Sequence, residues 1–207
     1  PWPQGARALG RAGFAERAAR ALVDPEGDNR HIIAQRSHPD ILRLHRLAKE
    51  PPKEGEEADP DAELKRSISI DQIRQLQQAL TTRPSMGPKR AVIIDSADDL
   101  ERGGANALLK SLEEPPVGTY FLLISHASDR LLPTIRSRCQ ILRFEPLNDA
   151  QMRQALAGLL PDMRESEREM LVRSGAGSPG QAMAFAGLDL GEIETAMDAI
   201  LANGDPT

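Results

Sequence analysis

The middle of the chain alternates short apolar runs with stretches in which apolar residues recur at helical spacing. Residues 91–95 read AVIID and residues 119–125 read TYFLLIS, and both runs have the length and composition of buried strands. Between them, residues 103–116 predict a helix that two prolines end. Its apolar face, expected to pack on both strands, is made by Ala105, Leu108, Leu109 and Leu112. Strands that alternate with helices predict an α/β fold with a parallel, doubly wound sheet.

Flanking segments extend this pattern. Residues 14–23, FAERAARALV, predict a helix, and residues 67–70, SISI, resemble a strand. Residues 131–139, LLPTIRSRC, predict a short helix or turn, and residues 140–147, QILRFEPL, predict a third strand. One further helix has its apolar face made by Ile70, Ile73, Leu76 and Leu80.

Two changes of composition organise the chain. Between Lys49 and Lys65 the sequence is rich in proline and acid and lacks apolar periodicity, which predicts a solvated loop. After Leu147 the pattern becomes wholly helical. Residues 1–146 are therefore expected to form one α/β domain, and residues 147–207 a small helical lid. The helices expected in this lid lie in residues 148–160, 166–177, 178–187 and 191–202.

Charge and composition exclude several classes of function for this chain. The chain has 207 residues and a net charge of -5, so it has no overall basic field for tight binding to nucleic acid on its own. Aromatic residues make up 3%, which leaves few stacking platforms for single strands. The one cysteine, Cys139, excludes an intramolecular disulfide and a multi-cysteine zinc site within this chain. We expect a soluble protein of the reducing cytoplasm.

Residues 5–12, GARALGRA, have the spacing of a phosphate-binding loop, with Gly5 and Gly10 as its glycines. A working loop needs a lysine for the terminal phosphates and a Ser or Thr hydroxyl for magnesium. Arg11 and Ala12 stand in these two places. Ala12 cannot ligate a metal, and arginine is a planar fork rather than a compact ammonium. The favoured interpretation is a glycine-rich turn kept for its shape, or a degenerate nucleotide pocket without nucleotide.

Asp95 ends the first apolar strand and is a second candidate for nucleotide chemistry. Hydrolases of this architecture carry Asp and then Glu here, whereas this chain has Ser96, which is no general base at neutral pH without a partner. A capping or solvated turn residue is the alternative for Asp95. Asp98, Asp99 and Glu101 are interpreted as helix N-terminal charge that favours the helix dipole.

Ser137, Arg138 and Cys139 form the third candidate site. An arginine here can be an ordinary surface charge, but at the edge of a subunit a guanidinium can contact a neighbour's terminal phosphate and stabilise charge in phosphoryl transfer. Cys139 is interpreted as a small buried hydrophobe. His126 and the residues 38–40, HPD, are more typical of capping and turn positions than of a site.

Three stretches together resemble the clamp-loader family of the AAA+ proteins: residues 106–116, NALLKSLEEPP, residues 131–139 and residues 38–40. The order of motifs matches over residues 5–145, and residues 175–185, GAGSPGQAMAF, continue the match. The resemblance implies an AAA+ type P-loop domain followed by a helical lid. It also implies that the C-terminal collar helices of the family lie outside this chain.

In the ATP-hydrolysing gamma and tau members of this family, the phosphate loop has Lys-Ser/Thr, the strand ends in Asp-Glu, and the lid has an arginine. The corresponding positions here are Arg11-Ala12, Asp95-Ser96 and Gly180. This joint loss resembles the delta-prime branch, which implies a non-hydrolysing stator of the DNA polymerase III holoenzyme, a DNA-directed DNA polymerase. The alternative is an active, gamma/tau-like ATPase.

The delta-prime resemblance further implies that Arg138 acts in trans as an arginine finger, framed by Ser137 and Cys139 at the subunit interface. The implied partners are gamma/tau and delta subunits, with the sliding clamp and primed DNA reached through the complex. ATP and magnesium would belong to the partner subunit. Many members carry a four-cysteine zinc module between the phosphate loop and HPD, where this chain has no cysteine, so no zinc is expected.

Overall fold

The computed structural model describes residues 10–34, 37–50 and 62–186. The described chain divides into two compact units, one of which spans Arg11–Leu142 while the other includes residues 143–186. The first unit is α/β and the second is helical. The expected boundary near Pro146 lies a little further along the chain, and the assignment of residues 1–146 and 147–207 to two domains stays a prediction.

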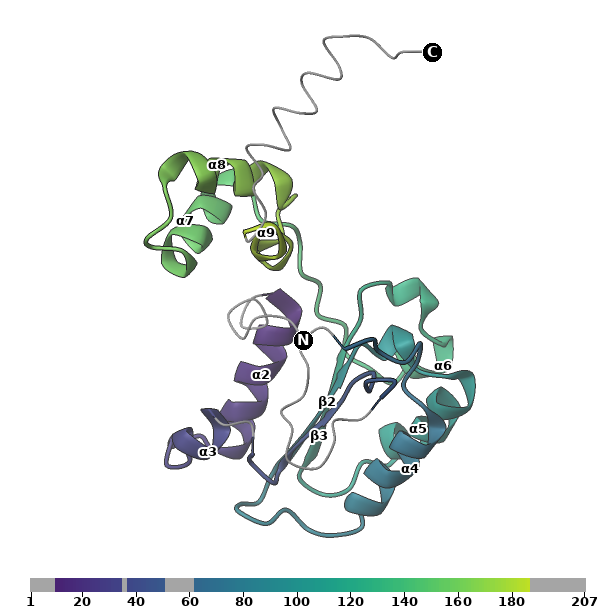
Figure 1. Ribbon diagram of the computed structural model, residues 1–207. Helices are drawn as coiled ribbons and strands as arrows, with labels where there is room; N and C mark the ends of the chain where they lie inside the picture. Colours follow the sequence, from purple (N-terminus) through teal and green to yellow (C-terminus); the bar gives the residue numbers. More distant parts are fainter. Residues whose placement is uncertain (1–9, 35–36, 51–61, 187–207) are drawn as a thin grey trace, which may run out of the picture. The chain divides into compact units, whose positions relative to one another are not determined.

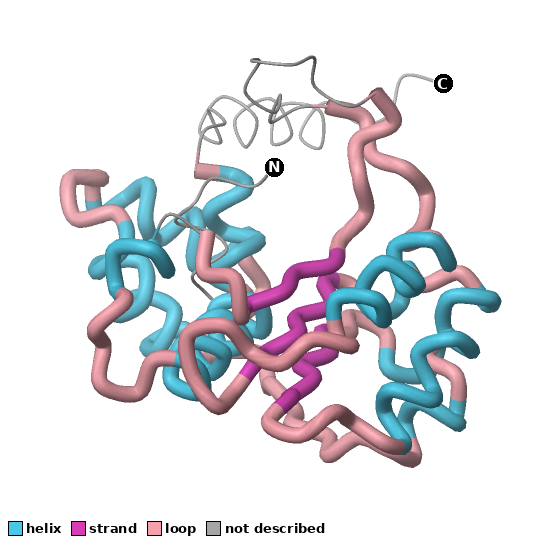
Figure 2. The backbone as a smooth tube through the Cα atoms, turned by 90° about the horizontal axis from the view of Figure 1, so that it is seen from below, coloured by secondary structure: helices cyan, strands magenta, loops and turns pink. Residues whose placement is uncertain are grey.

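A three-stranded parallel sheet forms the centre of the first unit (Figure 2). Its strands are β1 (Ile41–Leu44), β2 (Arg90–Asp95) and β3 (Thr119–Ile124), in the order β1-β2-β3. Ala91 in β2 lies opposite Ile41 in β1. Strand β2 is buried along almost its whole length because it has a neighbour on each side, whereas β3 is paired on one side within the described residues and is less buried.

Helices cover both faces of this sheet (Figure 1). Helices α2 (Gly10–Val23) and α3 (Arg30–Ala34) lie on one face, and α4 (Ile70–Ala79) and α5 (Arg102–Glu113) lie on the other. The short helix α6 (Pro133–Arg136) packs beside α5. The predicted α/β fold with a parallel, doubly wound sheet is confirmed, as are the helices predicted around α2, α4 and α5.

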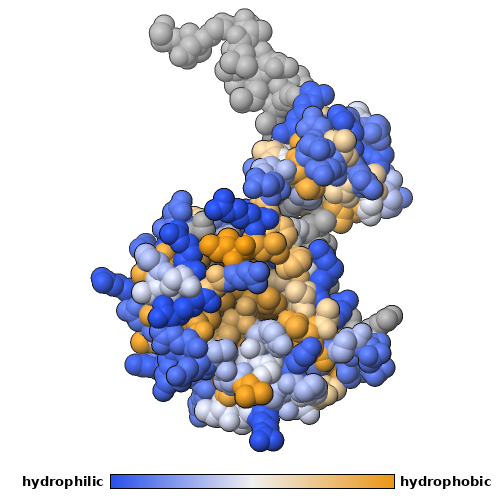
Figure 3. All heavy atoms as spheres, turned by 180° about the vertical axis from the view of Figure 1, so that it is seen from behind, coloured by the Kyte–Doolittle hydropathy of each residue, from blue (hydrophilic) through white to orange (hydrophobic). Residues whose placement is uncertain are grey.

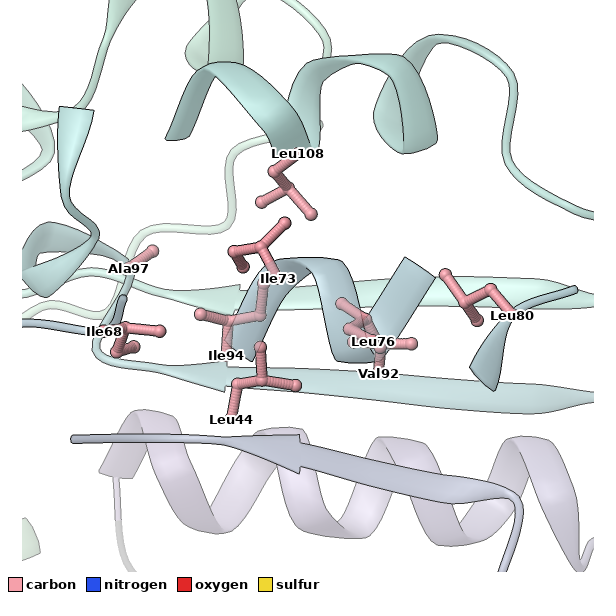
Figure 4. Close-up of a cluster of buried hydrophobic side chains, with 9 residues drawn as sticks. All are labelled: Leu44, Ile68, Ile73, Leu76, Leu80, Val92, Ile94, Ala97 and Leu108. Carbon is pink, nitrogen blue, oxygen red and sulfur yellow. The ribbon is translucent and has the colours of Figure 1, made fainter. Parts of the chain in front are cut away.

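Alternation along β2 explains the two hydrophobic clusters. Val92 and Ile94 point to one face and Ala91 and Ile93 to the other, as the two-residue period of a strand requires. The first cluster, between the sheet and α4 and α5, has its side chains directed toward one another (Figure 4) and contains Leu44, Ile68, Ile73, Leu76, Leu80, Val92, Ile94, Ala97 and Leu108. The second cluster, under α2 and α3, contains Ala15, Ala19, Val23, Ile33, Ile41, Ala91, Ile93 and Ile124.

The surface of the first unit is polar at its rim, and Figure 3 shows apolar residues gathered near the middle of the face seen from behind. Among the described residues, no helix combines the length and the apolar character that crossing a membrane requires.

In its described part, the second unit contains the helices α7 (Asp149–Leu159), α8 (Glu165–Ser174) and α9 (Pro179–Phe185). They enclose a separate core of Met152, Leu156, Leu171, Val172 and Ala182. These helices fall where apolar spacing predicts them. The helix expected over residues 191–202 lies outside the described residues.

The HPD residues form a turn at the amino ends of the strands, in which His38 and Asp40 are buried. The Asp40 carboxylate accepts hydrogen bonds from the backbone N–H groups of Ser85 (2.7 Å) and Met86 (2.8 Å). The guanidinium of Arg90, at the start of β2, lies 3.6 Å from Asp40 and donates to the carbonyl groups of Ala79, Thr82 and Arg83. Both side chains are at most 5% exposed, so this motif fixes the loop before β2 and is structural.

Several predicted elements differ in the structure. Residues 140–147 form no strand, and Ile141 and Leu142 are more than half exposed. No segment in the described part of the chain offers them a hydrogen-bonding partner strand, and an apolar alternation is not a strand without one. Residues 67–70 contribute only a single bridge, between Ile68 and Leu100. Strand β1, in contrast, was not predicted.

Leu109 is a further correction. It is only partly buried and does not belong to the first cluster, in which Leu108 is fully buried. Of the loop predicted between Lys49 and Lys65, residues 51–61 lie outside the described residues. Its two ends meet, because the backbone N–H of Lys49 donates to the Glu63 carbonyl (2.7 Å) and that of Lys65 to the Leu47 carbonyl (2.7 Å).

Candidate functional site

Two candidate sites follow from the fold, and the first lies at the carboxyl ends of β2 and β3. Asp95, the last residue of β2, pairs in register with Ile124, the last residue of β3. Ser96 follows the first strand and Ser125 and His126 follow the second. In open parallel α/β sheets, ligands bind at this edge, so the candidate Asp95 lies at the end where a ligand is expected.

Asp98, in the 3-10 helix Ala97–Asp99 directly after β2, is the centre of this end of the sheet. Its carboxylate accepts hydrogen bonds from the hydroxyl groups of Ser96 (2.8 Å) and Ser125 (2.7 Å). It also accepts from the backbone N–H groups of His126 (2.6 Å) and Ala127 (3.4 Å). The residue interpreted as helix N-terminal charge therefore ties the end of β2 to the end of β3.

The surroundings of Asp98 shift its acidity in two directions. Partial burial by itself raises the pKa of the carboxyl, because it disfavours the charged form. The hydrogen bonds from Ser125, His126, Ser96 and Ala127 stabilise that charged form, and together they hold the pKa of Asp98 below its ordinary value of 3.8. Asp98 is thus an ionised structural acceptor.

Arg11 joins this network from the first turn of α2. Its Nη1 donates to the Ser125 carbonyl (3.1 Å) and lies 3.1 Å from Nδ1 of His126, which accepts from it when the imidazole is neutral. Ala12, the next residue, packs against the second hydrophobic cluster. The two positions that supply lysine and hydroxyl in a working phosphate loop are therefore used here for contacts within the chain.

The glycines of the predicted loop are only partly described. Gly10 opens α2 with φ 74°, a left-handed conformation that favours glycine, and there is open space around the position of a Cβ. Backbone conformation, rather than a close approach, is what requires glycine there. Gly5 lies outside the described residues. The described residues contain no group of three or more His, Cys, Asp or Glu side chains that could hold a metal ion.

The second candidate site is the turn that follows α6. Arg138 lies one residue beyond Ser137, the C-cap of α6, and its backbone N–H donates to the Ile135 carbonyl (3.0 Å). Ile135 is buried and anchors the short helix, while Arg138 is exposed. An arginine on a firmly held turn can reach a second molecule, as a finger acting in trans requires.

The guanidinium of Arg138 is oriented by three acceptors. Its Nη1 donates to the Thr134 carbonyl (2.8 Å) and lies 3.4 Å from the Ser137 hydroxyl. Its Nη2 forms an ion pair at 2.5 Å with Glu113, the last residue of α5. Cys139 is half-buried, and burial raises the pKa of its thiol, so it is a packing residue rather than a reactive one.

The structure therefore brings Arg11 and Asp95 to one end of the sheet and places Arg138, with Ser137 and Cys139, at the turn after α6. Sequence reasoning missed Asp98 and Glu113. Asp98 contacts residues 27 to 29 positions away, and Glu113 contacts Arg138 across a strand and a helix, so no local spacing indicates either contact. The one available signal was the run of carboxylates at residues 98–101 next to a strand end.

The chain was compared with known proteins. The family model described as "DNA polymerase III, delta subunit" matches residues 3–148. DNA polymerase III subunit delta' of Pseudomonas aeruginosa is 35% identical over 175 residues, which cover 84% of this chain and 48% of that protein. The protein of the same name from Escherichia coli is 35% identical over 58% of this chain and 36% of its own length. The chain spans less than half the length of these relatives.

A second kind of relative is named DNA polymerase III subunit gamma/tau. The protein from Mycobacterium bovis is 34% identical over 53% of this chain and 20% of its own length. Among solved structures, a RuvB mutant from Thermotoga maritima has a TM-score of 0.51 and 17% identity and covers 95% of this chain and 55% of that one. This structural match supports the α/β fold and carries nothing about activity.

Proposed function

The chain belongs to the DNA polymerase III delta subunit family, and from this membership we propose that it is part of a non-hydrolysing, delta-prime-type subunit of a clamp loader. In this proposal the subunit works in the cytoplasm as a stator, with gamma/tau and delta subunits as neighbours. It helps to load the sliding clamp on primed DNA. Its contribution to the chemistry is Arg138, which completes the ATP site of an adjacent ATPase subunit.

The contacts of Arg11 support the lack of hydrolysis. Its guanidinium binds the end of β3, and Ala12 offers no hydroxyl for magnesium. Ser96 stands where such hydrolases carry Glu, and its hydroxyl donates to Asp98, so the residue after Asp95 supplies no general base for a water molecule. Gly180, in α9, has no side chain to reach a phosphate. We therefore expect ATP and magnesium to be held by the partner subunit.

The observation that carries the proposal is the exposed position of Arg138 on a turn fixed by Ile135. An arginine supplied in trans stabilises the charge that develops on the transferring phosphoryl group, and in well-studied GTPases it accelerates hydrolysis by about 10³–10⁵-fold. The planar fork of the guanidinium suits two phosphate oxygens, which a lysine cannot match. The sequence motif Ser137-Arg138-Cys139 is what predicts this role for Arg138.

The test is the Arg138→Ala substitution in the full-length protein, reconstituted with its ATPase partners. We expect DNA-stimulated ATP hydrolysis and clamp loading to fall several-fold, by much less than the GTPase figure because other ATP sites in the loader still work. Arg138→Lys should restore little. Folding should be unaffected, because Arg138 is exposed and outside the core clusters.

Arg136→Ala is the matched control. Arg136 is an exposed arginine at the end of α6, two residues before Arg138, and its ion pair, with Asp129, is separate from Arg138. Its loss should leave both rates unchanged. Equal rates for wild type and Arg138→Ala, in assemblies shown to be complete, would reduce Arg138 to a surface charge.

A further inference from the structure

Glu113 holds the guanidinium of Arg138 from a different helix. The ion pair joins the end of α5 to the turn after α6, and the two side chains are 35% (Arg138) and 46% (Glu113) exposed. Neither sequence motif nor local spacing assigns a role to this carboxylate. Its neighbour Glu114, also exposed, forms none of the ion pairs found among the described residues.

Both ends of this contact belong to segments anchored in the core. Helix α5 is anchored by the buried residues Ala105 and Leu108, and α6 is anchored by Ile135, which is 1% exposed. Glu113, at the end of α5, therefore contacts Nη2 of Arg138, while the Thr134 carbonyl, in α6, accepts from Nη1. Two acceptors on separate anchored elements define the plane of a guanidinium as well as its position.

The remaining donors still allow a ligand to bind. A guanidinium carries five N–H groups. The contacts with Thr134, Ser137 and Glu113 engage three of them. A phosphate oxygen can therefore approach the other N–H groups without displacing the carboxylate. An exposed ion pair adds little to stability, so its value in this place lies in orientation.

We propose that Glu113 is a positioning residue for Arg138, which sets the guanidinium before a neighbouring triphosphate arrives. This inference rests on the proposed function of Arg138 in trans. Pre-orientation lowers the cost of ordering a long side chain when the complex reaches the transition state. Removal of Glu113 should therefore lower turnover in the assembly while leaving the binding of ATP to the partner unchanged.

The experiment compares four variants of the full-length protein in the reconstituted loader: Glu113→Ala, Glu113→Gln, Arg138→Ala and the double variant Glu113→Ala/Arg138→Ala. Glu114→Ala removes the same charge one residue away and serves as the control. The measurements are kcat and KM for DNA-stimulated ATP hydrolysis, with thermal melts of each subunit. Glu113→Gln keeps the size of the side chain and an oxygen acceptor, so it tests the role even if the alanine variant folds poorly.

We expect Glu113→Ala to lower kcat about two- to fivefold, the size expected for one exposed ion pair, with KM unchanged. Glu113→Gln should lie between it and wild type, and Glu114→Ala should match wild type. In the Arg138→Ala background, Glu113→Ala should have no further effect, because it acts only through that guanidinium.

The other outcomes separate the two hypotheses. If Arg138→Ala lowers turnover but Glu113→Ala leaves it unchanged or raises it, the positioning role is wrong and the function of Arg138 stands. Losses that add in the double variant would show that Glu113 acts by another route, which also overturns the inference. If Arg138→Ala has no effect, the proposed function itself fails, and the role of Glu113 fails with it.

Discussion

At the scale of single residues, Asp98 joins three segments that are far apart in the sequence. It binds Ser96 after β2 and the residues after β3, and these in turn accept from Arg11 in α2. Four hydrogen bonds to one carboxylate are stabilising only while it is ionised, because a protonated oxygen is a poorer acceptor. The end of the sheet should therefore depend on the charge of Asp98.

We predict that Asp98→Asn destabilises the first unit in a pH-dependent way. The folded-state pKa of Asp98 is below 3.8, so the folded state binds this proton more weakly than the unfolded state. Its contribution to the free energy of unfolding is complete above pH 3.8 and is lost as the pH falls through 3.8 to the lower folded pKa. The variant should be less stable than wild type near neutral pH, and the difference should shrink in acid.

Urea unfolding near neutral pH and in acid measures this difference. Asp129→Asn is the control, since the Asp129 side chain is 97% exposed and its removal should change the free energy of unfolding little. A constant gap between Asp98→Asn and wild type over this range would mean that the carboxylate is not held ionised by its neighbours.

The residues of the two sites were not equally predictable. Arg138 and Arg11 were found because each belongs to a recognisable local motif. Glu113 and Asp98 were not, because Arg138 and the partners of Asp98 after β3 lie at least 25 positions away, and only the packing of strands and helices brings them together. Asp98 was assigned to a helix terminus because the sequence shows the charge of its side chain but not the direction in which that side chain points.

At the scale of elements, the helices and strands with the strongest apolar pattern were the ones predicted correctly from the sequence. Strand β2 was predicted because burial on both faces makes it a continuous apolar run, and helices α4 and α5 because burial on one face gives each an apolar period. Strand β1 is four residues long and contains Arg43, which pairs with Glu16 of α2, so its pattern is too short and too polar to stand out. Residues 140–147 show the reverse error, a strand-like alternation without a partner strand.

Helix α5 provides a direct test at this scale, because two adjacent leucines were both expected to be core. Leu108 is fully buried, and Leu109 is only partly buried and outside the cluster. We predict that Leu108→Ala lowers the free energy of unfolding by about 2–5 kcal/mol, as a truncated buried leucine does, and that Leu109→Ala costs clearly less. Urea denaturation of the two variants measures this, and equal losses would contradict the packing of α5.

At the scale of the whole molecule, the first unit has a polar network at each end of its sheet, and the two differ in kind. At the amino ends, Asp40 and Arg90 are almost completely buried and hold the loop before β2. At the carboxyl ends, where ligands bind in such folds, Arg11 and Asp98 are only partly buried. Arg138, at the turn after α6, is exposed, and the proposed role in trans depends on that exposure.

We predict that the protein does not bind Mg-ATP. A measurement of this binding distinguishes the proposed scaffold from an active ATPase. Arg11 donates to Ser125 and His126, and Ala12 cannot ligate magnesium, so the triphosphate would lose its main contacts and the metal its hydroxyl. Calorimetric titration of the full-length protein should give no saturable heat, whereas a gamma/tau-type ATPase partner should bind under the same conditions. Saturable binding, with hydrolysis that Asp95→Ala abolishes, would instead establish the gamma/tau-like alternative, because Asp95 is the carboxylate at the end of β2 where such an enzyme holds its metal.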